Sequence, residues 1–358
     1  MTTIERMENK MTENYVGKIV SGKDVYIGQD SPNGHIIITG ISGAGKSVRI
    51  ADLEQHIIDS GGTIIALDMN GTHEKVDGEK CCYISALKNG LDIRFLDTTL
   101  VKTGKETMTN LLQYAMETLC PRQLRGACQL AAVRNALKYA IEHKKDYRTE
   151  MQAITYGLGM QDSPAAAGAY NHLCDILEGN IFRRSEKQFQ EGKLNVVSLK
   201  GINPKTQKRI VEILLAVIWR KMRMSGEDRK QWTLVLDEFQ NLAMEKDTVL
   251  FQMLTEARKY KLRLILATQT LTVFTKNELA VINQAAIKLF FRPGSSDMKS
   301  VAEFIEPGKR DKWITELSHL RIGQAITVGS LEICRRPVNQ PIITSSEYET
   351  SGNSLLRI

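Results

Sequence analysis

The chain has 358 residues, of which 42% are hydrophobic and 25% charged, an ordinary composition for a soluble globular protein. Its net charge of +7 and its pI of about 9.0 fit a partner with a phosphate backbone but do not require one. No run of about 18 apolar residues occurs, and the N-terminus lacks the apolar core of a signal peptide. We therefore expect neither a membrane span nor a secretory signal.

The six cysteines stand at positions 81, 82, 120, 128, 174 and 334. They form no CxxC pair, and no histidine lies at the spacing of a zinc site. This pattern favours reduced thiols in a cytoplasmic protein, and it predicts no metal site other than one for Mg²⁺.

The N-terminal part of the chain carries the signals of an α/β fold. Residues 1–30 predict a tail followed by one or two short strands. His35–Thr39 is a β-branched run typical of a buried strand, and Val48–Ser60 has apolar residues at helical spacing. Thr63–Leu67 predicts a second buried strand that ends at Asp68. Strand, helix and strand in this order indicate a parallel β–α–β unit.

The β signals disappear between residues 105 and 190. Thr107–Leu119 and Gln123–His143 are amphipathic at helical spacing. Ser163 and Pro164 then predict an N-cap and a first helical position. We expect an all-α insertion over residues 105–190.

The α/β pattern returns after residue 190. A long helix is expected from about Pro204 to Met224, and another follows Asp237-Glu238 and runs through Arg258. Further strands are expected at Leu194–Leu199, Trp232–Leu236, Leu262–Ala267, Ile287–Phe291 and Ala325–Val328. These elements predict an α/β core, formed by residues 31–104 and 191–330, with a mostly parallel sheet covered on both faces. Residues 331–358 predict either an arm that lies on a neighbouring subunit or a final strand and tail.

Residues Gly40–Ser47 read GISGAGKS and match the phosphate-binding pattern G-x-x-x-x-G-K-[ST]. The glycines allow backbone N–H groups to surround phosphate oxygens, and the helix start adds its positive end. Lys46 is expected to reach the β- and γ-phosphates of ATP, and the Ser47 hydroxyl to bind Mg²⁺. The residues expected to contact the nucleotide are Ser42, Gly43, Ala44, Gly45, Lys46, Ser47 and Val48.

The strand Trp232–Leu236 leads directly into Asp237 and Glu238. An acidic residue at the carboxyl end of a buried strand is expected beside the phosphate loop in this fold. Asp237 would hold Mg²⁺, directly or through water, and Glu238 would polarise the water that attacks the γ-phosphate. This pair favours hydrolysis over phosphate transfer. The alternative is a strand-ending turn with two solvated acids.

Gln269 follows the predicted strand Leu262–Ala267 at the same edge of the sheet. A glutamine at this place can contact the γ-phosphate and report its presence. The alternative is a capping or turn residue.

The order of these motifs resembles the HerA–FtsK superfamily of DNA-pumping ATPases, which includes the type IV coupling proteins. The resemblance runs through GGTIIALDMNG, LDE, EARKYKLRLILATQT, IKLFFRPGSSDMKS and LRIGQAITVG. It covers about residues 30–330 apart from the helical insertion, which is reminiscent of the all-α domain of coupling proteins. It implies a RecA-like core that assembles into a hexameric ring and moves double-stranded DNA with ATP.

Rings of this kind supply an arginine from the neighbouring subunit to the γ-phosphate. The candidates are Arg258 in EARK and Arg292 in FFRPGS. FtsK-like members place an arginine where this chain has Lys288, so the resemblance leaves the choice open. Either arginine could instead be a surface or ion-pair residue.

Contacts with DNA are harder to assign. Basic clusters occur at Arg183-Arg184-Lys187, Lys205-Lys208-Arg209 and Arg220-Lys221-Arg223, but runs of charge usually form solvated faces. Aromatic residues make up only 6% of the chain, which does not indicate recognition by base stacking.

The motifs predict an ATPase, and the resemblance implies a homo-oligomer that translocates double-stranded DNA, with a nuclease or other effector protein as a candidate partner. The alternative is a scaffold that uses ATP to assemble, or to switch a partner effector, without translocating DNA.

Overall fold

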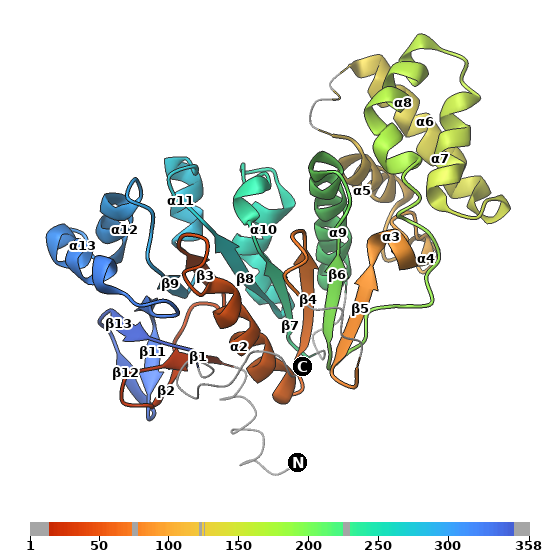
Figure 1. The fold of residues 1–358 in the computed structure, drawn as a ribbon. Coiled ribbons are helices and arrows are strands. Elements are labelled where there is room, and N and C mark those ends of the chain that lie inside the picture. The colour runs from red at the N-terminus through yellow and green to blue at the C-terminus, as the bar shows by residue number, and fades with distance from the viewer. Residues whose placement is uncertain (1–13, 74–77, 122–123, 125, 225–229, 347–358) are drawn as a thin grey trace. The chain divides into compact units, whose positions relative to one another are not determined.

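The computed structural model describes residues 14–73, 78–121, 124, 126–224 and 230–346, and Figure 1 shows its fold. The chain divides into two compact units. We call them the sheet unit, which consists of residues 1–83, 189–197 and 222–358, and the helical unit, which consists of residues 84–188 and 198–221. The tail expected at the N-terminus (1–13) and the end of the expected C-terminal segment (347–358) lie outside the described residues.

A nine-stranded sheet forms the centre of the described sheet unit. Its strands are β3 (Ile36–Thr39), β4 (Thr63–Asp68), β5 (Cys81–Ser85), β6 (Leu194–Ser198), β7 (Trp232–Leu236), β8 (Leu262–Thr268), β9 (Ile287–Phe290), β10 (Ala325–Gly329) and β13 (Ile342–Thr344). They lie in the order β13-β10-β9-β3-β8-β7-β4-β6-β5. The pairs from β9 to β4 are parallel, whereas β10 pairs antiparallel with both β9 and β13. The predicted α/β fold with a mostly parallel sheet is confirmed.

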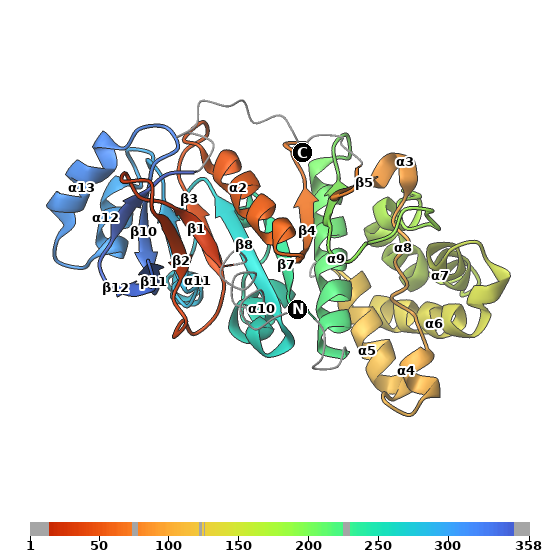
Figure 2. The same cartoon turned by 90° about the horizontal axis from the view of Figure 1, so that it is seen from below.

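Helices cover both faces of this sheet. Every residue of β4, β7 and β8 is buried, as expected for parallel strands that are covered on both sides. The helix α2 (Lys46–Asp59) connects β3 to β4 in one direction across the sheet, and α10 (Val249–Glu256) connects β7 to β8 in the other. Right-handed crossovers that run in opposite directions place their helices on opposite faces, as Figure 2 shows.

The remaining helices of the sheet unit are short. They are α11 (Lys276–Ile282), α12 (Met298–Ile305) and α13 (Arg310–His319), with the 3₁₀ turns η2 (Phe239–Asn241) and η3 (Ala257–Tyr260). The sequence predicts one helix from the acidic pair to Arg258, but the chain forms η2, α10 and η3 instead. Thr248 caps α10 by accepting a hydrogen bond from the Phe251 N–H at 3.3 Å, which starts that helix late.

A second sheet joins the two ends of the described chain. Its strands are β1 (Tyr15–Lys18), β2 (Asp24–Ile27), β11 (Leu331–Ile333) and β12 (Arg336–Val338), in the antiparallel order β1-β2-β11-β12. Apolar residues of β1, β2 and β11 share one core with α2 and the main sheet. The sequence left open whether residues 331–358 form an arm on a neighbouring subunit or a final strand and tail. Residues 331–346 form strands that pair within their own chain.

The helical unit is built from α3 (Ala86–Asn89), α4 (Thr99–Lys102), α5 (Met108–Leu119), α6 (Ala127–His143), the 3₁₀ turn η1 (Lys144–Asp146), α7 (Glu150–Gly159), α8 (Pro164–Leu177) and most of α9 (Pro204–Met224). Side-chain caps explain several helix starts. Ser163 accepts the Ala166 N–H at 3.1 Å, with Pro164 at the first helical position as predicted. The described residues contain no helix long and apolar enough to cross a membrane.

Candidate nucleotide site

The predicted phosphate loop, acidic pair and Gln269 meet at one edge of the main sheet. Parallel strands in this register end side by side, with Thr39 opposite Thr268, and Leu236 opposite both Leu266 and Leu67. The phosphate loop, Asp68, the acidic pair and Gln269 follow directly from these strand ends. Local strand patterns therefore bring together residues from four separate segments.

The phosphate loop has the backbone shape that its glycines allow. Gly43 and Gly45 have φ of +78° and +103°, in the left-handed region that favours glycine. A Cβ at Gly45 would lie 2.6 Å from the Cα of Gly323, so a second glycine packs directly against the loop. A Cβ at Gly43 would meet nothing within 4 Å, which leaves the outer side of the loop accessible to a ligand.

The Lys46 side chain folds back onto the first residues of this loop. Its Nζ donates hydrogen bonds to the carbonyls of Gly40 (2.7 Å) and Ile41 (3.1 Å). Burial lowers the pKa of Lys46, against the charges of Asp237 and Glu238, which favour the ammonium form. A phosphate group could take the place of the two neutral carbonyls as the stronger, charged acceptor.

The acidic pair faces this lysine from the end of β7. Burial and the charge of Glu238 raise the pKa of Asp237, while a hydrogen bond from the Glu238 N–H to Asp237 Oδ1 (2.9 Å) and the charges of Lys46 and His73 act in the opposite direction. Glu238 adopts φ +57°, a left-handed conformation that is uncommon for a residue with a side chain. The chain accepts this strain while turning from β7 into η2, and the turn puts both carboxylates at the sheet edge.

Gln269 holds the carboxylate of Glu238. Its Nε2 donates to Glu238 Oε1 at 2.6 Å, and Gln240 donates to the other oxygen, Oε2. The predicted γ-phosphate contact and the predicted base are thus joined by a direct hydrogen bond. The loop N–H groups and the Lys46 ammonium supply hydrogen-bond donors, and the carboxylates of Asp237 and Glu238 supply acceptors. This set of groups fits a nucleotide phosphate chain with Mg²⁺.

A histidine that the sequence analysis did not single out lies beside the acidic pair. His73 Nε2 is 3.0 Å from Glu54 Oε1, and its Nδ1 is 3.8 Å from Asp68 Oδ2. Burial alone would lower the pKa of His73, but Glu54, Asp68 and Asp237 together raise it to about 9. The imidazole is therefore a cation at neutral pH that balances a cluster of three carboxylates.

Asp68 shapes the turn that carries this histidine. Its carboxylate accepts hydrogen bonds from the N–H groups of Gly71 (2.7 Å), Thr72 (3.0 Å) and His73 (3.2 Å). Asn70-Gly71, two residues after Asp68, is a local turn signal. The contact of His73 with Glu54 involves a different element, so no local sequence pattern indicates it.

Asp297 connects the loops after β8 and β9. It is 3% exposed and accepts hydrogen bonds from the Leu271 N–H (3.1 Å), the Thr272 hydroxyl (2.9 Å) and the Thr270 hydroxyl. Gln269 and Arg292 lie near the starts of these two loops. Asp297 therefore fixes the loop that carries Gln269 relative to the loop that carries Arg292. No motif in the sequence predicts this link.

The two candidate arginines occupy different edges of the sheet. The Arg292 carbonyl accepts the Ile41 N–H at 3.0 Å, so this arginine lies beside the phosphate loop of its own chain, with an exposed side chain. Arg258 lies in η3, just before β8, and is exposed at the amino edge, away from the phosphate loop. Lys288 lies within β9, opposite Ile37, rather than at the site.

Residues from the N-terminal and C-terminal parts of the chain pack against the phosphate loop and the first turn of α2. The Gly323 N–H donates to the Ala44 carbonyl at 2.9 Å. Arg49, one turn into α2 and fully buried, donates to the Val16 carbonyl (3.1 Å) and to Thr344 Oγ1 (3.0 Å). The segment LRIGQA therefore contributes to the nucleotide site by packing under it.

Comparison with known proteins agrees with this architecture. The DNA double-strand break repair helicase HerA of Sulfolobus acidocaldarius is 25% identical over 351 residues, which cover 88% of this chain and 66% of the relative. This chain thus spans about two thirds of the length of that relative.

Several solved structures share the fold. VirB4 of Thermoanaerobacter pseudethanolicus superimposes with a TM-score of 0.71 at 17% identity, covering 94% of this chain and 97% of that one. The bacterial conjugative coupling protein TrwBdeltaN70 gives 0.69 at 16% identity, with 96% and 90% covered. The fold is that of the RecA-like P-loop ATPases. A family model described as "Helicase HerA, central domain" matches residues 14–218, more than half of the sequence, and the chain belongs to this family.

Proposed function

We propose that this protein hydrolyses ATP with Mg²⁺ and uses the energy to move double-stranded DNA. The observation that carries the proposal is the hydrogen bond between Gln269 and Glu238, at the sheet edge where the phosphate loop begins. This contact gives the chain a means to connect the presence of a γ-phosphate with the position of a general base.

Each group has a distinct role in this reaction. The N–H groups of Gly43–Ser47 and the Lys46 ammonium would bind the β- and γ-phosphates. Ser47 and Asp237 would hold Mg²⁺, which neutralises phosphate charge when bound. Glu238 orients the attacking water and takes its proton, and Gln269 keeps the carboxylate in place.

DNA as the substrate is supported by the relatives rather than by a motif. The curated relative is named as a repair helicase, and structures of the coupling protein TrwB hold the ATP analogue ADPNP or ADP with Mg²⁺. We extend nucleotide and DNA use to this chain as a proposal, together with a cytoplasmic setting and a nuclease or other effector as partner.

A ring of identical subunits is supported by apolar side chains around the site. Ile41 is 40% exposed on the phosphate loop, Ile322 is 76% exposed beside Gly323, and Val273 is 58% exposed after Gln269. Exposed apolar groups gathered at a polar site are typical of a subunit interface. Since Arg258 lies at the opposite edge of the sheet, we propose it as the arginine that reaches a neighbour's site, with Arg292 serving its own.

Displacement of a third DNA strand tests the motor directly. A duplex that carries a fluorescent triplex-forming strand is incubated with the protein, and release of this strand is followed after ATP is added. We expect ATP-dependent release that Lys46→Ala abolishes. ATP turnover without release would favour the alternative, an ATP-dependent scaffold that switches a partner.

A further inference from the structure

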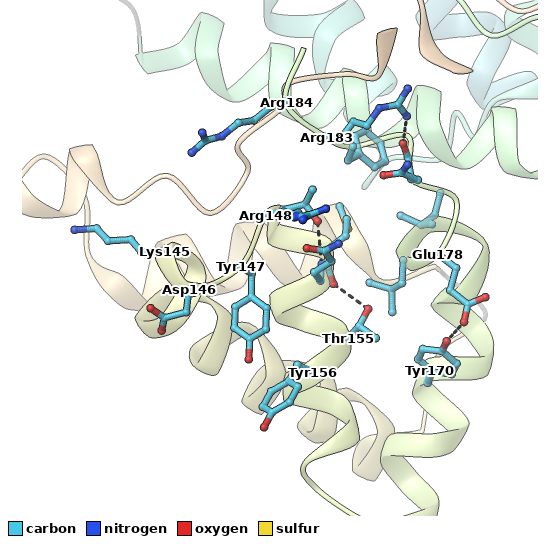
Figure 3. A pocket seen from close by; sticks show the side chains of 17 residues that line it. Lys145, Asp146, Tyr147, Arg148, Thr155, Tyr156, Tyr170, Glu178, Arg183 and Arg184 are labelled. Carbon is cyan, nitrogen blue, oxygen red and sulfur yellow. Dashed lines mark hydrogen bonds between the residues drawn. The ribbon is translucent and has the colours of Figure 1, made fainter. Parts of the chain in front are cut away.

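The helical unit contains a groove that the nucleotide chemistry does not use. Its volume is about 1250 Å³, and it is lined by two segments that are separate in the sequence (Figure 3): the stretch from η1 through α7, and α8 with the chain after it. A smaller cavity of about 310 Å³ shares Arg148, Arg183 and Arg184 with it and extends the groove towards Lys102.

Positive charge predominates along this groove. Its lining includes four cations (Lys145, Arg148, Arg183 and Arg184) and two carboxylates (Asp146 and Glu178). In the described part of the chain, each carboxylate has a partner other than these cations: His143 lies 3.5 Å from Asp146, and the hydroxyl of Tyr170, which also lines the groove, donates to Glu178. No described carboxylate lies within ion-pair distance of Arg148 or Arg184, whose side chains are exposed.

Arg183 is fixed by the backbone rather than by an acid. Its Nη2 donates to the carbonyls of Leu87 (2.9 Å) and Lys88 (2.8 Å), which hold the guanidinium at the groove without neutralising it. The other basic clusters in this unit are used differently: Arg220 pairs with Glu106, and Arg209 donates to the Leu119 carbonyl at 2.6 Å. Of the residues in the three clusters noted in the sequence, Arg183 and Arg184 line this cavity.

Tyrosine rings line the other side of the groove. Tyr147 and Tyr156 lie 5.6 Å apart between ring centroids, and both pack against Tyr139, at 6.3 and 5.7 Å. The Tyr139 and Tyr147 hydroxyls share a hydrogen bond of 2.7 Å, which fixes the pair, while Tyr156 is 51% exposed. The overall aromatic content of 6% conceals this local concentration.

We propose that this groove binds an extended single strand of nucleic acid, with Arg148, Arg183 and Arg184 on the phosphates and Tyr156 stacked on a base. The groove is larger than the roughly 300–1,000 Å³ of small-molecule sites, and its charged lining differs from their apolar walls. Cations with exposed aromatic rings are the combination that binds single strands, because unstacked bases offer their faces. In a duplex these faces are covered by neighbouring bases.

Binding of a short fluorescent oligothymidylate by the full chain, followed by anisotropy without ATP, tests the proposal. Arg148→Ala with Arg184→Ala should weaken binding by roughly tenfold or more and lower the slope of log affinity against log salt by about 1.4. Tyr156→Ala should weaken it by about fivefold or more, and Tyr156→Phe should bind like the wild type. Because no ATP is present, the result is independent of the motor function, and Lys46→Ala should bind normally.

Matched control variants show whether a loss of oligonucleotide affinity arises from the groove itself. Lys138→Ala with Lys200→Ala removes the same charge from exposed positions of the same unit outside the groove, and should change affinity by less than about twofold. Unchanged ATP turnover without DNA shows that each variant is folded. Equal losses in the two double variants, no effect of Tyr156→Ala, or no binding by the wild type would each overturn the proposal. So would an equal loss of affinity for a duplex of the same length in Arg148→Ala with Arg184→Ala.

Discussion

The nucleotide edge of the sheet unit and the groove of the helical unit both gather polar side chains, but in opposite ways. At the sheet edge, Asp68 and Lys46 are nearly buried, and the site groups bind one another. In the groove, Arg148 and Arg184 are exposed and unpaired in the described structure. A preorganised, partly buried site suits chemistry on a small charged group, whereas exposed cations suit a long anion that must bind and leave.

The substitution Glu238→Gln should have the largest effect on turnover. If the sheet edge performs the hydrolysis, the loss of the base should lower kcat by about 10²- to 10⁴-fold. ATP affinity, measured by titration with a fluorescent nucleotide, should remain because the phosphate loop is intact. Glu303→Gln, which makes the same charge change at an exposed position of α12, serves as the control. Near-normal turnover would remove Glu238 from this role.

Substitutions of Arg258 and Arg292 test which edge of the sheet contributes an arginine to a neighbouring subunit. Arg258→Ala should abolish turnover about as strongly as Glu238→Gln if it serves a neighbouring subunit. Equal mixing of the two inactive proteins should then restore roughly a quarter of the sites, since each needs the intact partner residue from a different subunit. Mixing Arg292→Ala with Glu238→Gln should give no rescue. The reverse pattern would assign the contact between subunits to Arg292.

Gln269→Ala tests whether the amide matters to the base. Loss of a hydrogen bond to a charged group costs about 1.5–3 kcal/mol, so kcat should fall about 10- to 100-fold with little change in KM. A steady-state assay over a range of ATP concentrations measures both. An unchanged kcat would mean that the 2.6 Å contact with Glu238 plays no part in turnover.

His73 should have the smallest effect, and it should appear in stability. The pKa of His73 is raised from 6.5 to about 9, so its contribution to folding is complete below pH 6.5 and disappears as pH rises through 9. The Tm difference between wild type and His73→Gln should therefore be largest at low pH and vanish above pH 9. A difference that does not vary with pH would contradict the ion cluster.

The nucleotide edge was largely predictable because its signals are local. GISGAGKS and the strand that leads into Asp237-Glu238 specify both the residue types and their place at a strand end. Because parallel strands end at the same edge of the sheet, these residues are brought together. The roles assigned to these residues stay predictions until they are measured.

Contacts between distant segments left no such signal. The pairing of Ile27 with Leu331 joins the two ends of the chain, and the contact of His73 with Glu54 depends on how a turn packs on α2. The helix α7 was not predicted because EMQAITYGLG combines glycines with β-branched residues, and tertiary packing overrides that weak propensity. The groove could not be predicted for the same reason, since its charged residues come from two segments that are distant in the sequence.

The ATP turnover rate with and without double-stranded DNA, on protein whose mass in solution is known, tests the central claim most directly. We expect an assembly heavier than one chain whose turnover rises severalfold when duplex is added, with Glu238→Gln inactive in both conditions. An intact assembly that hydrolyses ATP at the same rate with and without duplex would contradict the DNA motor.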